Sequence, residues 1–422
     1  MGTPKVITLG CRLNTFESEV MREIGADAGL DDAIIINTCA VTAEAERQAR
    51  QTIRRAKRDN PDARIIVTGC AAQLNADAFA AMAEVDRVLG NEEKLDPAVL
   101  AGDGAPVQVA DIMTVKETAP PVISGLEGRT RAFVQIQQGC DHRCTYCIIP
   151  FARGPNRSVA IDAIIAQVRG LVDARYLEVV LTGVDICSYG ADVSGTPDLA
   201  GLISQLLAAV PGLARLRLST VDPAVVDEAL IRLLAEEERL MPHLHLSLQA
   251  MDDVVLKRMK RRHARHDAFD VVARARAVRP DTVFGADLIA GFPTETEPMF
   301  ENTLAAVGDL DLAYLHVFPY SPRPVTPAAR MPQVDAKVRK GRAGRLRLAG
   351  EAGLKRFLES RTGTTAQVLV EQDGQGMSRG LSRGLSQHYA PVRLDFSAPI
   401  GAIVDARVTA AGDDYLIASK AA

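Results

Sequence analysis

Tryptophan is absent from the sequence, and aromatic residues account for only 4% of its 422 residues. Aromatic side chains are the usual stacking platforms for single-stranded nucleic acid, so such platforms cannot be numerous here. No apolar run approaches the roughly 20 residues that span a membrane, and the first residues form no apolar signal core. We therefore expect a cytoplasmic protein without a membrane partner.

An excess of positive charge is also missing, because the net charge is −4 at pH 7. Nucleic-acid binding therefore has no global signature. Locally, basic residues gather in three segments, residues 48–58, 257–265 and 337–347. Solvated helix faces are the ordinary explanation of one such segment. Three of them in an acidic chain predict a surface that binds phosphate groups.

The N-terminal quarter alternates short apolar runs with helical stretches, which favours an open parallel α/β sheet covered on both faces. The expected strands are residues 6–9, 33–36, 65–67 and 87–89, and the expected helices are residues 15–27, 43–59 and 76–82. We take residues 1–115 as this first domain. Residues 116–130 carry Pro-Pro and two glycines and predict a linker.

The middle of the chain repeats one pattern, a strand followed by a helical stretch. The expected strands are residues 132–137, 176–181, 214–218, 243–248, 282–289 and 313–318, and residues 335–358 read as one long basic helix. Strand-and-helix repeats of this length are typical of parallel βα units. Residues 131–358 are therefore expected to form a six-unit partial (β/α) barrel, with reactive groups at the C-terminal ends of its strands.

The last segment changes character. Residues 359–422 contain short alternating runs separated by glycine-rich turns, which predicts a small β-barrel of about five strands. Within it, residues 378–386 (SRGLSRGLS) form a tandem repeat that is most simply a flexible loop.

Seven cysteines are present, without the framework of a small disulfide-rich protein. Clustered cysteines in a reducing compartment indicate metal binding or redox chemistry. Cys140, Cys144 and Cys147, below called the loop cysteines, have the spacing C-x3-C-x2-C directly after the first barrel strand. A 4Fe–4S cluster normally takes four thiolates, so three of them leave one iron open to a substrate.

A zinc site is the main alternative at the loop cysteines, with His142 as the fourth ligand. A purely structural cluster of thiols is another. Zinc motifs usually come as two paired Cys or Cys/His elements, and no second pair lies nearby in the sequence. The iron–sulfur interpretation is therefore favoured.

Cys11, Cys39 and Cys70, below called the sheet cysteines, form a second set. Each follows a predicted strand, in the sequences VITLGC, IIINTC and IIVTGC. Groups at the carboxyl ends of neighbouring parallel strands converge on one crevice. A single cysteine is often only a small buried hydrophobe, but three repetitions of the pattern predict a second cluster with one open iron. Cys187, the remaining cysteine, is expected to be structural.

C-x3-C-x2-C after the first strand of a six-unit barrel resembles the radical S-adenosylmethionine (SAM) superfamily. In that superfamily the open iron binds the amino and carboxylate groups of SAM, and electron transfer yields a 5′-deoxyadenosyl radical. With its second set of cysteines the whole chain resembles the methylthiotransferase family. Its members join an N-terminal cluster domain, a radical SAM barrel and a TRAM domain, which is a small RNA-binding β-barrel. The resemblance implies two 4Fe–4S clusters and SAM as cofactors.

The resemblance also implies roles for individual residues. The loop cysteines would be the catalytic set, and all six cysteines of the two sets would bind iron. SAM would be contacted by Thr182, Gly183, Ser219, Asp222 and Gln249 at the ends of barrel strands and by Asp287 within the fifth strand. Arg153 and Arg157, just beyond the cysteine loop, are expected to bind a phosphate or a substrate carboxylate, because a guanidinium group suits both.

One branch of the family fits best. Residues 8–14 (TLGCRLN), followed by Glu17, are similar to the branch that acts on threonylcarbamoyladenosine next to the tRNA anticodon. Residues 147–154 (CIIPFARG), 316–321 (HVFPYS) and 326–331 (TPAARM) point the same way. The branches for a ribosomal protein and for isopentenyladenosine usually have Pro-Lys-Asn or Gln-Met-Asn after the first cysteine, and both are missing here.

The chain departs from the family in two places. The interval from Cys11 to Cys39 is several residues shorter than usual, which predicts a tighter cluster pocket. The family's Gln-Ser-Gly turn after the fourth barrel strand is replaced by Gln249-Ala250-Met251. Losing glycine removes easy access to positive φ, so we expect a different turn near the cofactor.

The resemblance implies insertion of a methylthio group at carbon 2 of N6-threonylcarbamoyladenosine. Expected partners are the anticodon arm of tRNA and an electron donor such as flavodoxin or ferredoxin. Three alternatives stay open: the same chemistry on isopentenyladenosine in tRNA, the same chemistry on a ribosomal protein, or a non-catalytic iron–sulfur redox sensor that binds RNA.

Overall fold

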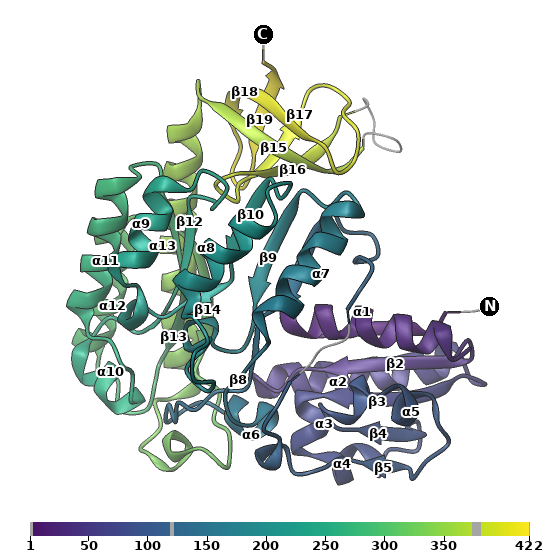
Figure 1. Ribbon diagram of the computed structural model, residues 1–422. Helices are drawn as coiled ribbons and strands as arrows, with labels where there is room; N and C mark the ends of the chain where they lie inside the picture. The colour runs from purple at the N-terminus through teal and green to yellow at the C-terminus, as the bar shows by residue number, and fades with distance from the viewer. Residues whose placement is uncertain (1–2, 119–121, 374–380, 422) are drawn as a thin grey trace.

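The computed structural model describes residues 3–118, 122–373 and 381–421. Three regions follow one another along the chain: a parallel sheet, an open barrel and a closed antiparallel barrel (Figure 1). The predicted α/β fold class is thereby confirmed. Parts of the predicted linker and of the tandem repeat lie outside the described residues.

The N-terminal region is a five-stranded parallel sheet in the order β1-β2-β3-β4-β5. Its strands are β1 (Lys5–Thr8), β2 (Ala33–Thr38), β3 (Arg64–Gly69), β4 (Arg87–Leu89) and β5 (Val107–Gln108). Its helices are α1 (Arg12–Asp27), α2 (Ala43–Asp59), α3 (Cys70–Leu74), α4 (Ala76–Ala80) and α5 (Pro97–Ala101). The sequence did not predict β5, because two residues are too short to show a period.

Helices cover both faces of this sheet, and the alternation of side chains along β2 shows how. Ile35 belongs to the apolar cluster of α1 and α5, whereas Ile34 and Ile36 belong to that of α2, α3 and α4. All six residues of β2 are buried, as expected for a central parallel strand. The carboxyl ends of β1, β2 and β3 remain at one edge, and the sheet cysteines follow them.

The middle region is the open barrel. Its six wall positions are β6 (Arg131–Gln135), β9 (Glu178–Thr182), β10 (Arg215–Leu218) continued by β11 (Thr220–Val221), β12 (His243–Gln249), β13 (Val283–Ala290) and β14 (Leu312–Pro319). The third position changes its partner at Ser219, because β10 pairs with β9 and β11 pairs with β12, so the wall consists of two sheets, β10-β9-β6 and β11-β12-β13-β14. A short antiparallel pair, β7 (Gln137–Gln138) and β8 (Arg157–Ser158), lies beside the cysteine loop.

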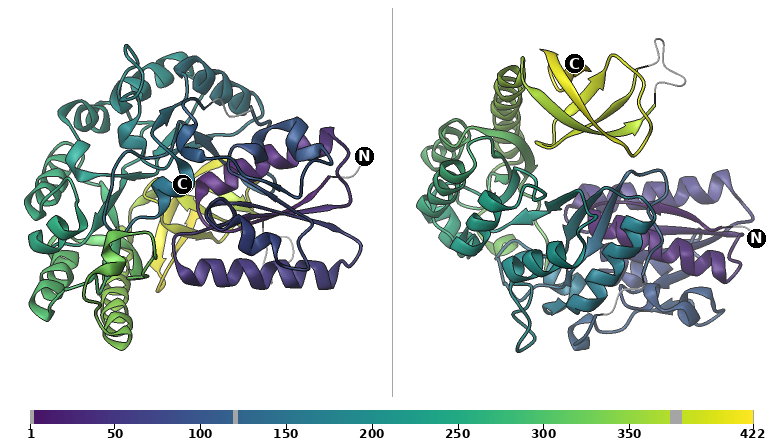
Figure 2. Two further views of the ribbon diagram at one scale, coloured as in Figure 1. Left: turned by 90° about the horizontal axis from the view of Figure 1, so that it is seen from below. Right: turned by 45° about the horizontal axis from the view of Figure 1, so that its top comes forward.

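Helices form the outer layer of the barrel. They are α7 (Ile161–Asp173), α8 (Leu199–Ala209), α9 (Glu228–Glu236), α10 (Asp253–Met259), α11 (Arg265–Val278), α12 (Glu297–Asp309) and α13 (Ala336–Arg361), whereas the short α6 (Ile149–Arg153) packs against α3. Figure 2 shows them as an arc that leaves one side open toward the N-terminal sheet. The open side lies between the edge strands β6 and β14, and α1 packs against β6.

The C-terminal region is a closed barrel in the order β15-β16-β17-β19-β18. Its strands are β15 (Thr365–Gln372), β16 (Arg383–Ser386), β17 (Pro391–Leu394), β18 (Ile403–Ala411) and β19 (Leu416–Lys420). The long helix α13 leads into it, and it sits over the barrel end at which the parallel strands begin (Figure 1).

The prediction of a flexible loop for the tandem repeat was wrong in its second half. Residues 378–380 lie outside the described residues, but Arg383–Ser386 form β16. A Cβ atom at Gly384 would lie 2.0 Å from the carbonyl oxygen of Leu369 in β15. The glycine that made the repeat read as a loop is therefore what lets two strands approach closely. In the described part of the chain, no helix is long and apolar enough to span a membrane.

Candidate functional site

The sheet cysteines lie together at the carboxyl edge of the N-terminal sheet, and two glycines allow this. Gly10 and Gly69 precede Cys11 and Cys70, and their φ angles are +100° and +94°. A Cβ at Gly10 would lie 2.9 Å from Cys39 Sγ, and one at Gly69 would lie 2.4 Å from the carbonyl oxygen of Thr38. Only glycine combines that φ with that proximity. The repeated Gly-Cys sequence thus packs two strand ends against the third.

The three sheet cysteines differ in exposure. Cys11 is exposed, whereas Cys39 and Cys70 are buried. Burial raises the pKa of Cys39 to about 11. The Nε of Arg153 donates to Cys70 Sγ at 3.1 Å. Three thiols, with Arg153 beside one of them and Cys11 exposed, are suited to hold a metal cluster that a substrate can approach from the solvent.

Arg153 belongs to a buried ion network that joins the two cysteine sites. It ends α6, which begins two residues after Cys147. Its guanidinium pairs with Glu17 of α1, and Lys94 Nζ contacts Glu17 at 2.6 Å. Burial acts to raise the pKa of Glu17, but Arg153 and Lys94 outweigh it and hold the pKa at about 2. A buried carboxylate paired with two cations can remain charged, and removal of one partner would lower the stability of the fold.

The loop cysteines are carried by a loop whose backbone is fixed at several points. Gly139 has φ +72°, and a Cβ there would lie 1.7 Å from the carbonyl oxygen of Pro155. The amide of Cys140 donates to Gly154 O at 3.0 Å, and that of Thr145 donates to Met259 O at 3.0 Å. The three thiols are thus held by tertiary hydrogen bonds on both sides of the loop.

Burial disfavours the thiolate form of two of the loop cysteines. It raises the pKa of Cys140 and of Cys147 to about 12. The Nη1 of Arg261 approaches Cys144 Sγ at 3.6 Å, and its Nη2 donates to Asp222 at 2.9 Å. Buried thiols become thiolates readily only when a metal supplies positive charge. The donor set therefore fits an iron–sulfur cluster with one open iron.

His142 is engaged elsewhere, which weakens the zinc alternative. Its Nε2 lies 3.1 Å from Asp185 Oδ2, and Ser188 donates to the same oxygen. Cys140, His142 and Asp185 do bring their ligand atoms within 4.8 Å of one another. In the described residues, however, no such tight group contains two loop cysteines. The wider spacing of the thiols favours a cluster over a single ion.

The predicted SAM contacts on the second and third strands lie near the cysteine loop. Thr182 is buried at the end of β9. A Cβ at Gly183 would lie 2.8 Å from the Gln137 side chain, so this turn accepts only glycine without movement. Ser219 stands at the break between β10 and β11. Asp222 accepts hydrogen bonds from Arg261 and Arg262, which lower its pKa together with His263 against the effect of burial.

Gln249 and Asp287 differ from that group. Gln249 itself takes the left-handed conformation, φ +66°, and its Nε2 donates to Ser247. The turn therefore has its positive φ at its first residue, Gln249. The turn does not require a glycine at position 251, where the family usually has one. Asp287 lies within β13, as expected, and one of its oxygens contacts His245 at 3.0 Å and His316 at 3.1 Å. SAM binding by these residues stays a prediction.

Comparison with known proteins places this arrangement in a family. The family model described as "Radical SAM superfamily" matches residues 134–307, and "Uncharacterized protein family UPF0004" matches residues 3–90. The chain is 48% identical over 412 residues to a threonylcarbamoyladenosine tRNA methylthiotransferase MtaB of Rickettsia prowazekii, covering 98% of this chain and 96% of that one. The chain belongs to the radical SAM methylthiotransferase family.

Other family members are more distant over similar lengths. The protein of the same name from Aquifex aeolicus is 34% identical, over 94% of this chain and 98% of that one. A tRNA-2-methylthio-N(6)-dimethylallyladenosine synthase of Erythrobacter litoralis is also 34% identical, over 98% and 96%. Among solved structures, the radical SAM methyltransferase TsrM of Kitasatospora setae superposes with a TM-score of 0.57 at 15% identity, over 78% and 74%. That likeness supports the fold.

Two residues important for the site were missed from the sequence. Gln137 accepts from the amides of Val184 and Asp185 and so fixes the turn that contains Gly183. Arg261 connects Cys144 with Asp222. Its signal was present but misread, since it lies in the basic segment 257–265 that was assigned to phosphate binding.

The prediction that Arg153 and Arg157 bind external anions is not supported by their surroundings. Arg153 is 1% exposed and paired with Glu17. Arg157 is also 1% exposed and donates to the carbonyl oxygens of Arg153 and Pro155. Cys187 accepts from the amide of Asp222 at 3.2 Å and packs against the barrel core, as a structural cysteine does.

All three basic segments hold some of their cations in ion pairs and expose others. In residues 257–265, Arg261 and Arg262 pair with Asp222. In residues 337–347, Arg342 is buried against Glu295, and Arg345 pairs with acidic residues of α12. Residues 48–58 remain largely exposed on α2. The phosphate-binding surface therefore stays a prediction for all three segments.

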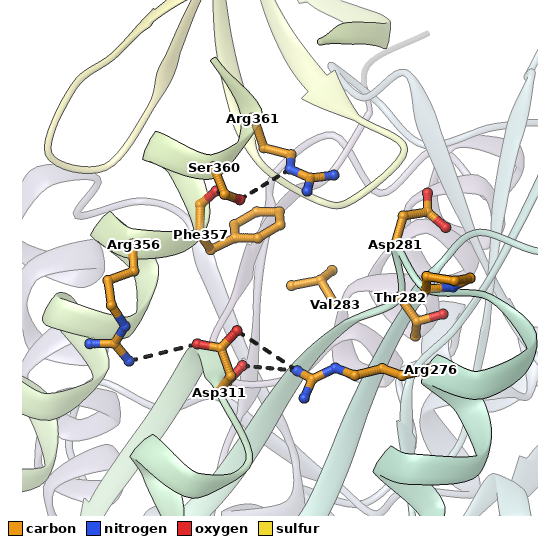
Figure 3. A pocket seen from close by; sticks show the side chains of 10 residues that line it. Arg276, Asp281, Thr282, Val283, Asp311, Arg356, Phe357, Ser360 and Arg361 are labelled. Atoms are coloured by element: carbon orange, nitrogen blue, oxygen red, sulfur yellow. Dashed lines mark hydrogen bonds and ion pairs between the residues drawn. The ribbon is translucent and has the colours of Figure 1, made fainter. Parts of the chain in front are cut away.

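A cavity of about 270 Å³ lies apart from both cysteine sites, between α11, the start of β13 and the end of α13. Figure 3 shows Arg276 and Arg356 directed at Asp311 from opposite sides, 4.0 Å and 3.7 Å away. Arg361 donates to Ser360 at the rim. Asp311 neutralises much of the positive charge of Arg276 and Arg356, so we assign this cavity no role in the reaction.

Proposed function

We propose that the protein is a threonylcarbamoyladenosine tRNA methylthiotransferase, an enzyme that adds a methylthio group to carbon 2 of N6-threonylcarbamoyladenosine. One structural observation carries the proposal: two separate sets of three cysteines in one chain, joined by Arg153 through contacts with Cys70 and Glu17. The Rickettsia prowazekii protein of that name, 48% identical over nearly the whole chain, supports the substrate.

Both sets would hold a 4Fe–4S cluster, the loop cysteines at the barrel and the sheet cysteines at the N-terminal sheet. Three thiols in each set leave one iron without a protein ligand. When bound, the clusters and SAM supply the one-electron chemistry and the sulfur that the reaction needs. The residues Thr182, Gly183, Ser219, Asp222, Gln249 and Asp287 are proposed to contact SAM.

The chain's own part is to position and to shield. Gly183 and the Gln137 side chain shape the turn beside the loop cysteines. Arg261, fixed by Asp222, holds a positive charge next to Cys144. The ion pair of Glu17 with Arg153 links α1 and α6, the helices that follow Cys11 and Cys147. Electrostatic groups held in place before the reaction cost no reorganisation during it.

Three regions would divide the work. Residues 1–115 would hold the sulfur-donating site, residues 131–358 the SAM site, and residues 359–422 would bind RNA as a TRAM-like barrel, with residues 116–130 as a linker. The substrate base lies in the anticodon arm, where a single-stranded loop lets a base leave its stack. A flavodoxin or ferredoxin would supply electrons, and we place the reaction in the cytoplasm, where tRNA is modified.

Mass spectrometry of nucleosides from digested tRNA tests the proposal. Deleting the gene in its source organism should remove 2-methylthio-N6-threonylcarbamoyladenosine and leave its unthiolated precursor to accumulate. Loss of the methylthio derivative of isopentenyladenosine instead would assign the enzyme to the other tRNA branch. An unchanged nucleoside profile would reject tRNA as the substrate.

A further inference from the structure

Residues from all three regions meet at Tyr389, in the turn between β16 and β17. Its ring stacks on the imidazole of His243 in β12, with centroids 5.0 Å apart and planes 16° apart. Arg12 Nη2 donates to its hydroxyl at 3.1 Å. The guanidinium groups of Arg131 and Arg217 lie 5.4 Å and 5.2 Å from its ring centroid.

The charges of the cluster are not balanced. Arg131 pairs with Glu371, and Arg217 pairs with Glu178. Among the described residues, no carboxylate lies within ion-pair distance of Arg12. Its hydrogen-bond partner is the hydroxyl group of Tyr389. A half-buried guanidinium without an anion, close to two further guanidinium groups, creates a positive potential that favours an incoming anion.

His243 provides a second, independent observation. It is only 4% exposed, and neither of its ring nitrogens has a hydrogen-bond partner in the described residues. Unpaired buried polar atoms are rare, because each loses its hydrogen bonds to water. Burial and the charge of Arg217 hold the pKa of His243 well below its usual range, so the ring is neutral. A neutral ring offers one donor and one acceptor.

The cluster also lies close to the sulfur site. Arg12 directly follows Cys11, the exposed sheet cysteine, and opens helix α1. Helix α1 packs against β6, the edge strand at the open side of the barrel, and His243 faces the inside of that barrel next to His245. An anion held by Arg12 would therefore lie between the sheet cysteines and the barrel interior.

We propose that Arg12 binds the carboxylate of the threonylcarbamoyl group and thereby determines the substrate branch, with His243 offering an additional hydrogen bond. This inference rests on the proposed function. The threonyl end of that nucleoside carries an ionised carboxylate, whereas an isopentenyl group is uncharged. A guanidinium fork matches a carboxylate with two parallel hydrogen bonds. Arg12 is thus a specificity-determining residue, which discriminates by leaving a half-buried charge without an anion when the carboxylate is missing.

Binding of anticodon stem-loops to the anaerobically reconstituted holoenzyme tests the inference. The RNAs differ only at the target nucleoside: threonylcarbamoyladenosine, its neutral carboxamide analogue, or adenosine. Fluorescence anisotropy gives a Kd for each. Wild-type protein should bind the carboxylate form roughly tenfold to a hundredfold more tightly than the carboxamide form, as charge-assisted hydrogen bonds predict. The Arg12→Gln variant should bind both forms with equal, weak affinity.

Control variants separate recognition from folding. Arg12→Lys keeps the charge and should retain part of the preference, and Arg129→Gln removes an exposed arginine and should retain all of it. Iron content and circular dichroism show whether Arg12→Gln keeps its clusters and fold. If it does not, the comparison of carboxylate and carboxamide RNAs on wild-type protein with Arg12→Lys still decides.

Two results would overturn the inference: equal binding of carboxylate and carboxamide RNA by wild-type protein, or an undiminished preference in Arg12→Gln. Failure of the proposed function looks different. In that case wild-type holoenzyme would not methylthiolate the threonylcarbamoyladenosine stem-loop, whatever its affinity. If the enzyme modifies this RNA but binds the carboxylate and carboxamide forms equally, the proposed function stands and only the role of Arg12 is rejected.

Discussion

The two cysteine sites reach the same composition by different routes. The loop cysteines come from the eight-residue segment 140–147, and their loop is fixed by hydrogen bonds to distant backbone. The sheet cysteines come from three strand ends between residues 11 and 70 and converge only because the strands are parallel neighbours. A local site can be recognised from spacing, whereas a site assembled from strand ends requires knowledge of the sheet.

Removing one cysteine from each site should give the sharpest contrast. Cys144→Ala should abolish anaerobic cleavage of SAM, because the loop cluster loses one of three ligands. Cys39→Ala should preserve that cleavage and stop methylthio insertion. Chromatography of 5′-deoxyadenosine and mass spectrometry of the tRNA measure the two activities. Methylthiolation by Cys39→Ala would show that the sheet cysteines hold no essential cluster.

A matched pair of glycine substitutions should break the sites one at a time. Gly139→Ala places a Cβ 1.7 Å from Pro155 O at the loop site, and Gly69→Ala places one 2.4 Å from Thr38 O at the sheet site. Each variant should lose about half of the bound iron, since one 4Fe–4S cluster of two is lost. Only Gly69→Ala should keep SAM cleavage. Full iron content in either variant would contradict the strain argument.

The link between the sites should matter for stability. Arg153→Met leaves Glu17 buried with one cation fewer, which should lower the free energy of unfolding by about 3–5 kcal/mol. Urea denaturation measures this. Arg55→Ala serves as the control, because its exposed ion pair with Asp59 should contribute about 0.5 kcal/mol or less. Equal effects of the two substitutions would refute a structural role for the network.

Acid should weaken the same link in a defined window. Since the folded pKa of Glu17 is about 2 and its ordinary value is 4.5, its stabilisation is complete above pH 4.5 and is lost as the pH falls toward 2. The shift corresponds to about 3 kcal/mol. Unfolding free energies at pH 6 and pH 3 should therefore differ less in Glu17→Gln than in wild type. Identical pH dependence in both proteins would exclude Glu17 as the titrating group.

The smallest effect is expected at the turn beside the loop site. Gln249 holds φ +66°, a conformation that costs a non-glycine residue about 1 kcal/mol. Gln249→Gly should therefore leave stability unchanged or raise it by up to about 1 kcal/mol, although the hydrogen bond to Ser247 is lost. Thermal unfolding with and without SAM checks both stability and cofactor affinity. A stability loss above that magnitude would show that the side chain matters more than the backbone.

Much of the fold could be predicted because it is periodic. The helix expected at residues 43–59 occurs as Ala43–Asp59, and the strand expected at residues 87–89 occurs as Arg87–Leu89. The failures had local causes. β5 is too short to show alternation, and β16 was hidden because Gly384 made its sequence resemble a loop. The membership of each cysteine set was predicted, and only experiment can test the ligands.

The sequence by itself determined the chemistry that the chain can carry: the two sets of three cysteines, the glycines before Cys11 and Cys70, and the succession of parallel units. Those properties follow from residue type and spacing. Tertiary structure alone decided which charges meet. Arg153 and Arg261 looked like anion-binding residues and became internal partners of Glu17 and Asp222. Arg12 was left without a carboxylate. Ion pairing depends on the distances between side chains of separate helices and strands. These distances are set only when the elements pack together, so they cannot be read from the order of residues in the sequence.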